Sequence, residues 1–276
     1  MRRAIEQVLD LALLGGLFAR CCFRLGLQGH LTVTHQEVRL AAVLPRALKI
    51  AFASDFHAGP TTDPKLFSSL GEALRLHAPD LLLLGGDFVS ARARYIDALA
   101  PMLAACAAPL GKYAVLGNHD LWADDTHIVR ALTAAGVEVL VNRNAHLPAP
   151  FEAVSICGID DPWSGLPDVA RAFDSAGAVR IFMTHSPDGL LSLRGRKFDV
   201  GFAGHTHGGQ IARRDGSAFI LPDGPLCKAY AYGRFDIEAN GTFFVSRGIG
   251  CSTLPLRINA QPELLLCTVS NQEQEV

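Results

Sequence analysis

The sequence lacks a cysteine pattern that would indicate a disulfide framework or a zinc ribbon. Its seven cysteines are an odd number, and none stands in C-x-x-C spacing. Disulfide-rich secreted domains usually carry even sets of cysteines, and structural zinc sites need closely spaced pairs. The sequence therefore predicts a cytoplasmic protein with reduced thiols that mostly fill the core: Cys21, Cys22, Cys106, Cys157, Cys227, Cys251 and Cys267.

An excess of charge of either sign is also missing. The chain has 25 Lys and Arg against 27 Asp and Glu, so its formal net charge is -2. A protein that holds long nucleic acids through a general basic field needs a clear surplus of Lys and Arg. We therefore expect no long nucleic acid as a partner, and any phosphate group must be bound locally.

No apolar run is long enough for a membrane-spanning helix, which needs about 20 residues. Residues 11–19 are uninterrupted, but Asp10 and Arg20 bound this run. Residues 1–28 are nonetheless strongly apolar and predict an N-terminal helix over 5–27. One interpretation is a peripheral anchor in the membrane interface, with basic residues facing anionic headgroups: Arg2, Arg3, Arg20 and Arg24. A helix packed on the domain surface and a cleaved signal sequence are the alternatives.

The remaining residues, 29–276, predict one large domain. With 276 residues, 49% of them hydrophobic, the chain can bury a sizeable core, and it shows neither an internal repeat nor a linker-like stretch. Residues 30–40 alternate apolar and polar side chains, as a half-buried edge strand does.

Further along the chain, the order of the predicted elements indicates the fold class. Buried strands alternate with helices in the manner of βαβ units: strands at 48–54, 81–84 and 112–116, helices at 63–77, 91–107 and 124–135. Strands are also predicted at 137–141, 153–158, 179–183 and 199–203. After Gly209 the helical pattern stops, and further strands are predicted at 217–221, 229–235, 242–246 and 264–269. We therefore predict an α/β fold of mixed, α+β-like character, in which a two-sheet β-sandwich is flanked by helices.

Five short clusters of residues that can bind metal ions recur along the chain. They are Asp55-Phe56-His57, Gly86-Asp87, Gly117-Asn118-His119-Asp120, Thr184-His185 and Gly204-His205-Thr206-His207. Nearly all of them directly follow a short apolar run, and a buried strand that ends in such residues delivers them to one edge of a sheet. The clusters therefore predict a metal site built from several strands.

The number of candidate ligands favours two ions over one. Asp55, His57, Asp87, Asn118, His185, His205 and His207 offer seven imidazole, amide or carboxylate ligands. Seven exceed the needs of one tetrahedral ion, and a carboxylate can bridge two neighbouring ions that act on a phosphoryl group.

These residues, in this order, resemble the calcineurin-like metallophosphoesterase family, whose pattern is D-x-H, G-D, G-N-H-[DE], H and G-H-x-H. The resemblance covers roughly residues 48–269. The stretches 204–210, 245–250, 254–257 and 262–263 look like a bacterial branch of small, often membrane-associated phosphohydrolases. That branch includes phosphodiesterases and a lipid A pathway enzyme that hydrolyses UDP-2,3-diacylglucosamine.

The resemblance implies a role for each matched position. Asp55, His57 and His207 would hold one divalent ion, Asn118, His185 and His205 a second, and Asp87 would bridge the two. The ions implied are Mn²⁺, Zn²⁺ or Fe²⁺. As the catalytic residue, His119 would protonate the leaving oxygen or stabilise the developing negative charge, with Asp120 orienting its ring.

Substrate contacts outside the motifs are less defined. Arg247 and Arg257 could clamp a phosphate bidentately, although single arginines are more often structural. Trp163 could stack on a base or touch an acyl chain, although a packed turn aromatic is the more common role; Trp122 and His127 could line the same pocket.

Taken together, these features predict a dinuclear metal-dependent phosphohydrolase that cleaves a phosphodiester or diphosphate bond. The substrate would be a small molecule or a lipid-linked phosphate such as UDP-2,3-diacylglucosamine. The alternatives are a nucleotide phosphodiesterase or nuclease, and a non-catalytic scaffold of the same fold.

Overall fold

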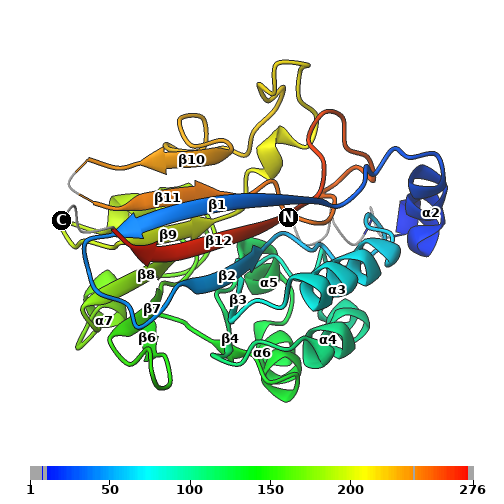
Figure 1. The fold of residues 1–276 in the computed structure, drawn as a ribbon. Coiled ribbons are helices and arrows are strands. Elements are labelled where there is room, and N and C mark those ends of the chain that lie inside the picture. Colours follow the sequence, from blue (N-terminus) through cyan, green and yellow to red (C-terminus); the bar gives the residue numbers. More distant parts are fainter. Residues whose placement is uncertain (1–7, 9–10, 239, 273–276) are drawn as a thin grey trace.

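The computed structural model describes residues 8, 11–238 and 240–272, and Figure 1 shows their arrangement. Two six-stranded mixed sheets face each other, with helices on the outer sides. The first sheet has the strand order β1 (Thr32–Leu40), β12 (Glu263–Asn271), β2 (Leu48–Ala53), β3 (Leu81–Leu84), β4 (Lys112–Ala114) and β5 (Glu138–Val139).

The second sheet has the order β10 (Gly233–Asp236), β11 (Thr242–Val245), β9 (Val200–Ala203), β8 (Val179–Met183), β7 (Val154–Gly158) and β6 (Arg143–His146). β2, β3, β4 and β5 run parallel to one another, and so do β7, β8, β9 and β11. The carboxyl ends of several strands in each sheet therefore meet at one edge of that sheet.

Helices cover the outer faces of both sheets. α3 (Lys65–His77), α4 (Ile96–Ala105) and α6 (Asp125–Ala134) lie beside the first sheet, and α7 (Val169–Ala172) lies beside the second. Short elements complete the description: α5 (Asn118–Trp122), η2 (Ala93–Tyr95), η3 (Pro187–Ser192) and η4 (His207–Gly209).

The core forms because each central strand buries both of its faces. In β2, Ile50 and Phe52 point into the cluster between the sheets, whereas Ala51 and Ala53 point toward the helices. The ring of Phe52 stacks on that of Phe202 from the opposite sheet, with 5.2 Å between the ring centroids. Burying a phenylalanine side chain stabilises a fold by about 1.5–3 kcal/mol, so such pairs fix how the sheets face each other.

The predicted fold class is confirmed. The strands predicted at 30–40, 48–54 and 81–84 correspond to β1, β2 and β3, and the three predicted helices correspond to α3, α4 and α6. The strand predicted at 217–221 is wrong, because this stretch makes only an isolated bridge between Ala212 and Ala218. The strand predicted at 229–235 begins later, at Gly233.

The N-terminal helix predicted over residues 5–27 is interrupted where the structure describes it. A short 3-10 turn, η1 (Leu14–Gly16), precedes α2 (Leu17–Arg24), and Gly15 and Gly16 have φ angles of 59° and 92°. These left-handed conformations suit glycine and break a right-handed helix. Residues 1–7 and 9–10, with Arg2 and Arg3, lie outside the described residues. Within the described residues, no helix has the length and apolar content that a bilayer crossing requires.

Candidate metal centre

The predicted ligands come together at one edge of the sandwich, because each follows a strand that ends there. Asp55 and His57 follow β2, and Asp87 follows β3. Asn118 begins α5, just after β4, whereas His185 follows β8 and the pair His205 and His207 follows β9. Both sheets thus contribute to one site, as the sequence predicts for parallel strands.

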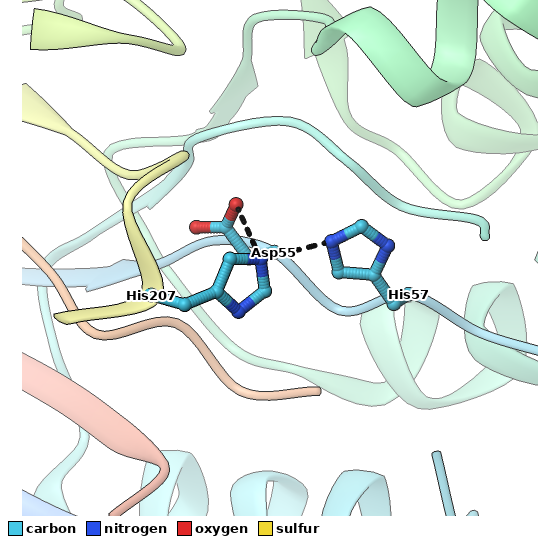
Figure 2. A group of neighbouring side chains, drawn as sticks. All are labelled: Asp55, His57 and His207. Atoms are coloured by element: carbon cyan, nitrogen blue, oxygen red, sulfur yellow. Dashed lines mark hydrogen bonds and ion pairs between the residues drawn. The ribbon is translucent and has the colours of Figure 1, made fainter. Parts of the chain in front are cut away.

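The first ligand cluster consists of Asp55, His57 and His207, which point toward one another in Figure 2. The Nε2 atoms of His57 and His207 are 3.0 Å apart, and His207 Nε2 lies 3.5 Å from Asp55 Oδ1. Ser54 Oγ donates to Asp55 Oδ2 at 2.6 Å, and the backbone N–H of His205 donates to the same carboxylate. The Asp55 carboxylate is therefore held in place from behind.

The second cluster consists of Asp87, His185 and His205, with Asn118 beside it in the cavity lining. His185 Nδ1 donates to the Gly85 carbonyl at 2.8 Å, which turns Nε2 toward Asp87 Oδ2 at 3.3 Å and His205 Nδ1 at 3.2 Å. A hydrogen bond at the far ring nitrogen is the usual way to orient a metal-binding histidine.

Asp87 lies between the two clusters. Its Oδ2 atom is 3.5 Å from His57 Nε2 as well as 3.3 Å from His185 Nε2, while Oδ1 accepts the backbone N–H of His119 at 2.9 Å. One carboxylate therefore touches members of both clusters, which is the position that a bridging ligand needs.

The backbone around these residues adopts conformations that are uncommon for side chains with a Cβ atom. The φ angles are positive at Asp55 (53°), His57 (44°), Asp87 (52°), His205 (71°) and His207 (54°). Such conformations cost about 1–3 kcal/mol each and tend to gather at functional sites. Gly117 and Gly204 leave the space that the carboxylates of Asp87 and Asp55 occupy, because a Cβ atom at either glycine would collide with them.

Burial sets the charge of most of these groups. It lowers the pKa of His57 and His207 well below the ordinary value and that of His205 to about 3, so these rings are neutral and can offer lone pairs. Burial raises the pKa of Asp55 to about 6.

At Asp87 burial alone would raise the pKa, but the charge of His185 and further histidines outweighs it and lowers the pKa well below the usual value. Reciprocally, burial would lower the pKa of His185, but Asp87 raises it well above the ordinary value. The two groups therefore favour the charged pair in the absence of ions.

The residues fit a pair of cations. Because His207 Nδ1 accepts from Arg257, its Nε2–H donates to His57 Nε2 at 3.0 Å in the absence of ions, and this contact brings two ligand nitrogens together. The buried atoms Asn118 Oδ1 and His205 Nε2 have no hydrogen-bond partner within the described part of the chain. An amide oxygen that is buried without a donor is explained by a cation, and the mixture of nitrogen and oxygen ligands suits borderline divalent ions. This is a candidate dimetal site.

His119 lies at the rim of the site. Its ring Nδ1 is 2.7 Å from the Ser90 carbonyl, so Nδ1 carries the proton in this contact. The His57 ring meets it edge-on with 4.6 Å between centroids. Ser90 was not predicted from the sequence; its position three residues after Asp87 is the only signal that could have pointed to it.

Asp120 joins two loops of the site. It is fully buried, and its carboxylate accepts backbone N–H groups from Phe88 at 2.8 Å, Val89 at 3.3 Å and Gly117 at 2.9 Å. These bonds tie the loop after β3 to the start of α5. Asp120 thus positions the two loops, and its expected effect on the orientation of the His119 ring stays a prediction.

The two arginines expected at the substrate have other neighbours. Arg257 is 3% exposed and donates to the carbonyls of Gly250 and Ala260, with Nη2 3.2 Å from His207 Nδ1. Arg247 packs over the Tyr232 ring, 4.5 Å from its centroid, and its Nη2 donates to Thr32 Oγ1 at 3.2 Å. These contacts favour structural roles behind the site over the substrate contacts that the sequence suggested.

A cavity of about 670 Å³ opens over the ligand clusters. On its polar side it is lined by Asp87, Asn118, His119, His205 and His207. Its other walls carry mainly apolar and aromatic side chains, which are Trp122, Trp163, Ile211, Ile220, Leu221, Pro222 and Leu254. His127 is not among the lining residues and instead contacts Asp97 at 3.3 Å.

Known proteins with similar sequences point to one family. Residues 48–209 match the calcineurin-like phosphoesterase family. The chain is 32% identical to the phosphodiesterase YaeI of Escherichia coli over 232 residues, which cover 79% of this chain and 80% of that protein. It is 29% identical to the metallophosphoesterase YkuE of Bacillus subtilis over 254 residues, 89% of this chain and 88% of that one.

Among solved structures, the NAD nucleotidase NadN of Haemophilus influenzae has a similar fold, with a TM-score of 0.50 at 15% identity. The match covers 74% of this chain and 45% of that one. At this identity the likeness concerns the fold alone. Since the family match spans more than half of the chain and carries the residues of the candidate dimetal site, this protein belongs to the calcineurin-like phosphoesterase family and is a hydrolase of phosphoric esters.

Proposed function

We propose that the protein hydrolyses a phosphodiester or diphosphate bond in a lipid-linked substrate, with two divalent ions bound at the candidate centre. The observation that carries this proposal is the cavity. Four predicted metal ligands and the predicted acid His119 line the same cavity as a mainly apolar wall. A volume of about 670 Å³ is far larger than a phosphate group needs. The relative YaeI, whose name is phosphodiesterase, supports the bond type.

In this proposal the protein groups have distinct tasks. Asp55, His57 and His207 would hold one ion, Asn118, His185 and His205 would hold the other, and Asp87 would bridge them. When bound, such ions activate water and offset the negative charge of the phosphoryl group. His119 donates a proton to the leaving oxygen, and the Ser90 carbonyl fixes its ring so that Nε2 is the nitrogen that delivers the proton.

The exposed surface of the N-terminal segment supports a lipid-linked substrate. Ala19 and Cys22 face the domain, whereas apolar side chains point outward: Leu11, Leu14, Leu17, Phe18 and Leu25, each more than half exposed. Arg20 and Arg24 are exposed on the same helix and could contact anionic headgroups. We propose that this surface touches the membrane peripherally, which would bring the cavity to an amphiphile at the interface.

Removing the segment is a poor test of this contact, because its end is built into the domain. The Gln28 side chain donates to the carbonyls of Thr61 and Pro255 and accepts the N–H of Asp63, and the Leu27 carbonyl accepts the N–H of Arg257. A truncation through Gln28 would therefore disturb the loop behind His207.

Substitution on the exposed side is the sharper experiment. The double variant Leu17→Gln, Phe18→Gln should bind vesicles of phosphatidylglycerol and phosphatidylcholine about tenfold or more weakly, because each immersed apolar side chain contributes about 1.5–3 kcal/mol. The matched control is Leu166→Gln, Leu191→Gln, two residues that are 83% and 57% exposed on other parts of the surface. Equal binding by both variants would refute the membrane contact.

A substrate screen tests the activity itself. The purified chain is stripped of metal, supplied with Mn²⁺, Zn²⁺ or Fe²⁺, and assayed on an aryl phosphomonoester, an aryl phosphodiester, UDP-2,3-diacylglucosamine, a cyclic nucleotide and a dinucleotide. We expect metal-dependent turnover that is higher on the diester and on the lipid-linked diphosphate than on the monoester. Turnover restricted to cyclic or dinucleotide substrates would instead favour the nucleotide phosphodiesterase.

A further inference from the structure

We propose that Trp163 determines specificity by packing against a bulky, uncharged ester group of the substrate, and that Asp161 positions Trp163. This inference rests on the proposed function, since it assigns a wall of the cavity to the part of the substrate that does not react. The ester group that packs against Trp163 would then be planar or apolar.

Trp163 stands directly beside the candidate centre. It lines the cavity, and its ring lies edge-on to that of His205, with 4.9 Å between centroids and 62° between the ring planes. Since His205 is a predicted ligand, a phosphoryl group bound at the centre places one of its ester groups within reach of the indole. A rigid indole with a large apolar face is well suited to hold such a group.

Asp161 holds the backbone that carries this indole. Its side chain is fully buried, and Oδ2 accepts the N–H of Trp163 at 3.1 Å and that of Ser164 at 2.6 Å. The turn is fixed once more by Asp160, whose Oδ1 accepts the N–H of Asp161 at 2.9 Å and whose Oδ2 accepts that of Leu166 at 2.9 Å. Trp163 is thus placed by hydrogen bonds to its own backbone.

The cost of burying Asp161 indicates that its position matters. Its Oδ1 atom is buried and has no hydrogen-bond partner among residues 11–238 and 240–272. A buried carboxylate oxygen without a donor is unfavourable for stability, and burial raises the pKa of Asp161 to about 6. The two N–H groups that Oδ2 accepts, from Trp163 and Ser164, offset part of this cost.

The charges around the cavity define what can pack there. Within the part of the chain that the structure describes, neither Lys nor Arg lines the cavity, and Asp223 adds a negative charge at its rim. An ester group that carried a further phosphate would find no counter-charge on this wall. The apolar residues Ile211, Ile220 and Leu254 instead favour an uncharged group.

The test compares two diesters with the same leaving group, bis(4-nitrophenyl) phosphate and methyl 4-nitrophenyl phosphate, in the presence of Mn²⁺. Trp163→Ala should lower kcat/KM about tenfold or more for the bis-aryl substrate, mainly through KM, because the change removes the stacking of an aryl ring on the indole. The methyl substrate should change less than about threefold. Leu166→Ala is the matched control, since Leu166 belongs to the same turn, is 83% exposed and does not line the cavity.

Asp161 is tested by its own pair of variants. Asp161→Ala should reproduce the loss of discrimination between the two diesters, whereas Asp161→Asn, which can still accept both N–H groups, should keep it. If Asp161→Ala fails to fold, the comparison of Trp163→Ala with Leu166→Ala still decides the role of Trp163.

The outcomes separate the two proposals. If the wild-type chain hydrolyses neither diester with any of the metals, the proposed function fails and takes this inference with it. If it hydrolyses both, but Trp163→Ala lowers kcat/KM equally for the two substrates, only the specificity role of Trp163 is overturned. If Asp161→Asn loses discrimination as fully as Asp161→Ala, the positioning role of Asp161 is overturned.

Discussion

Replacing Asp87 by asparagine tests the bridging position most directly. Asp87 is 2% exposed, and its Oδ2 atom lies 3.3 Å from His185 Nε2 and 3.5 Å from His57 Nε2, one in each cluster. Asparagine has nearly the same shape and can still accept the N–H of His119 through its amide oxygen. The change therefore removes one negative charge with little effect on packing.

The magnitude follows from the position of that charge. A unit charge about 4 Å from a carboxylate is attracted by about 4 kcal/mol at an effective dielectric constant of 20. Since each 1.4 kcal/mol is a factor of ten, the affinity for at least one divalent ion should fall about 10³-fold. Turnover at limiting Mn²⁺ should fall with it.

The assay is Mn²⁺ titration by calorimetry, combined with elemental analysis of the metal that remains after gel filtration. Asp223→Asn is the matched control, because Asp223 lines the same cavity but belongs to neither ligand cluster, and its metal content should equal that of the wild type. If Asp87→Asn bound two ions with wild-type affinity, the bridging assignment would be refuted.

Three further predictions concern the acid, the core and the surface. His119→Ala should retain both metal ions in elemental analysis yet lose about 10²–10⁴-fold in kcat, as expected for a general acid. A loss of bound metal in this variant would contradict that role. Phe202→Ala should lower the free energy of unfolding by about 3–5 kcal/mol in urea titrations, because Phe202 is fully buried between the sheets. A decrease of less than about 1 kcal/mol would contradict the packing of its ring on Phe52. At Asp80, burial alone would raise the pKa, but hydrogen bonds from Arg46 and a backbone N–H outweigh it and lower the pKa. A carboxylate with a lowered pKa in the folded state stabilises the fold above its unfolded pKa of about 3.9, and this stabilisation is lost as the pH falls. Asp80→Asn should therefore lower the free energy of unfolding by at most about 1 kcal/mol at pH 7 and by less at pH 3.5. A larger loss of unfolding free energy at pH 3.5 than at pH 7 would contradict this sign.

Much of the fold could be predicted because it follows from local patterns. Short apolar runs at 48–54 and 81–84 have the length and composition of strands that are buried on both faces, and they became β2 and β3. The helix predicted at 63–77 became α3, because Asp63 and Pro64 supply a local start signal for a helix. The prediction failed at 217–221, where Ala218 makes one isolated bridge and the stretch joins neither sheet, since a strand depends on a neighbour that its own sequence does not specify.

The prediction of a continuous N-terminal helix failed for a different reason. Its composition is largely apolar, but the pair Gly15-Gly16 adopts left-handed conformations and interrupts it. The glycines were visible in the sequence, yet glycine within a helical pattern is often tolerated, and only the backbone angles show that here it breaks the helix.

By itself, the sequence determined the order of strands and helices, the family and the residues that reach the edge of the sandwich. This was possible because a side chain that directly follows a buried strand is carried to the strand's end, whatever the rest of the chain does. Only the tertiary structure decided the partners of those residues: the Ser90 carbonyl at His119, the loop-joining role of Asp120, the burial of Arg257 behind His207, and the turn through which Asp161 places Trp163. Such contacts join segments that are far apart in the chain or depend on how a turn packs, and no local periodicity encodes them.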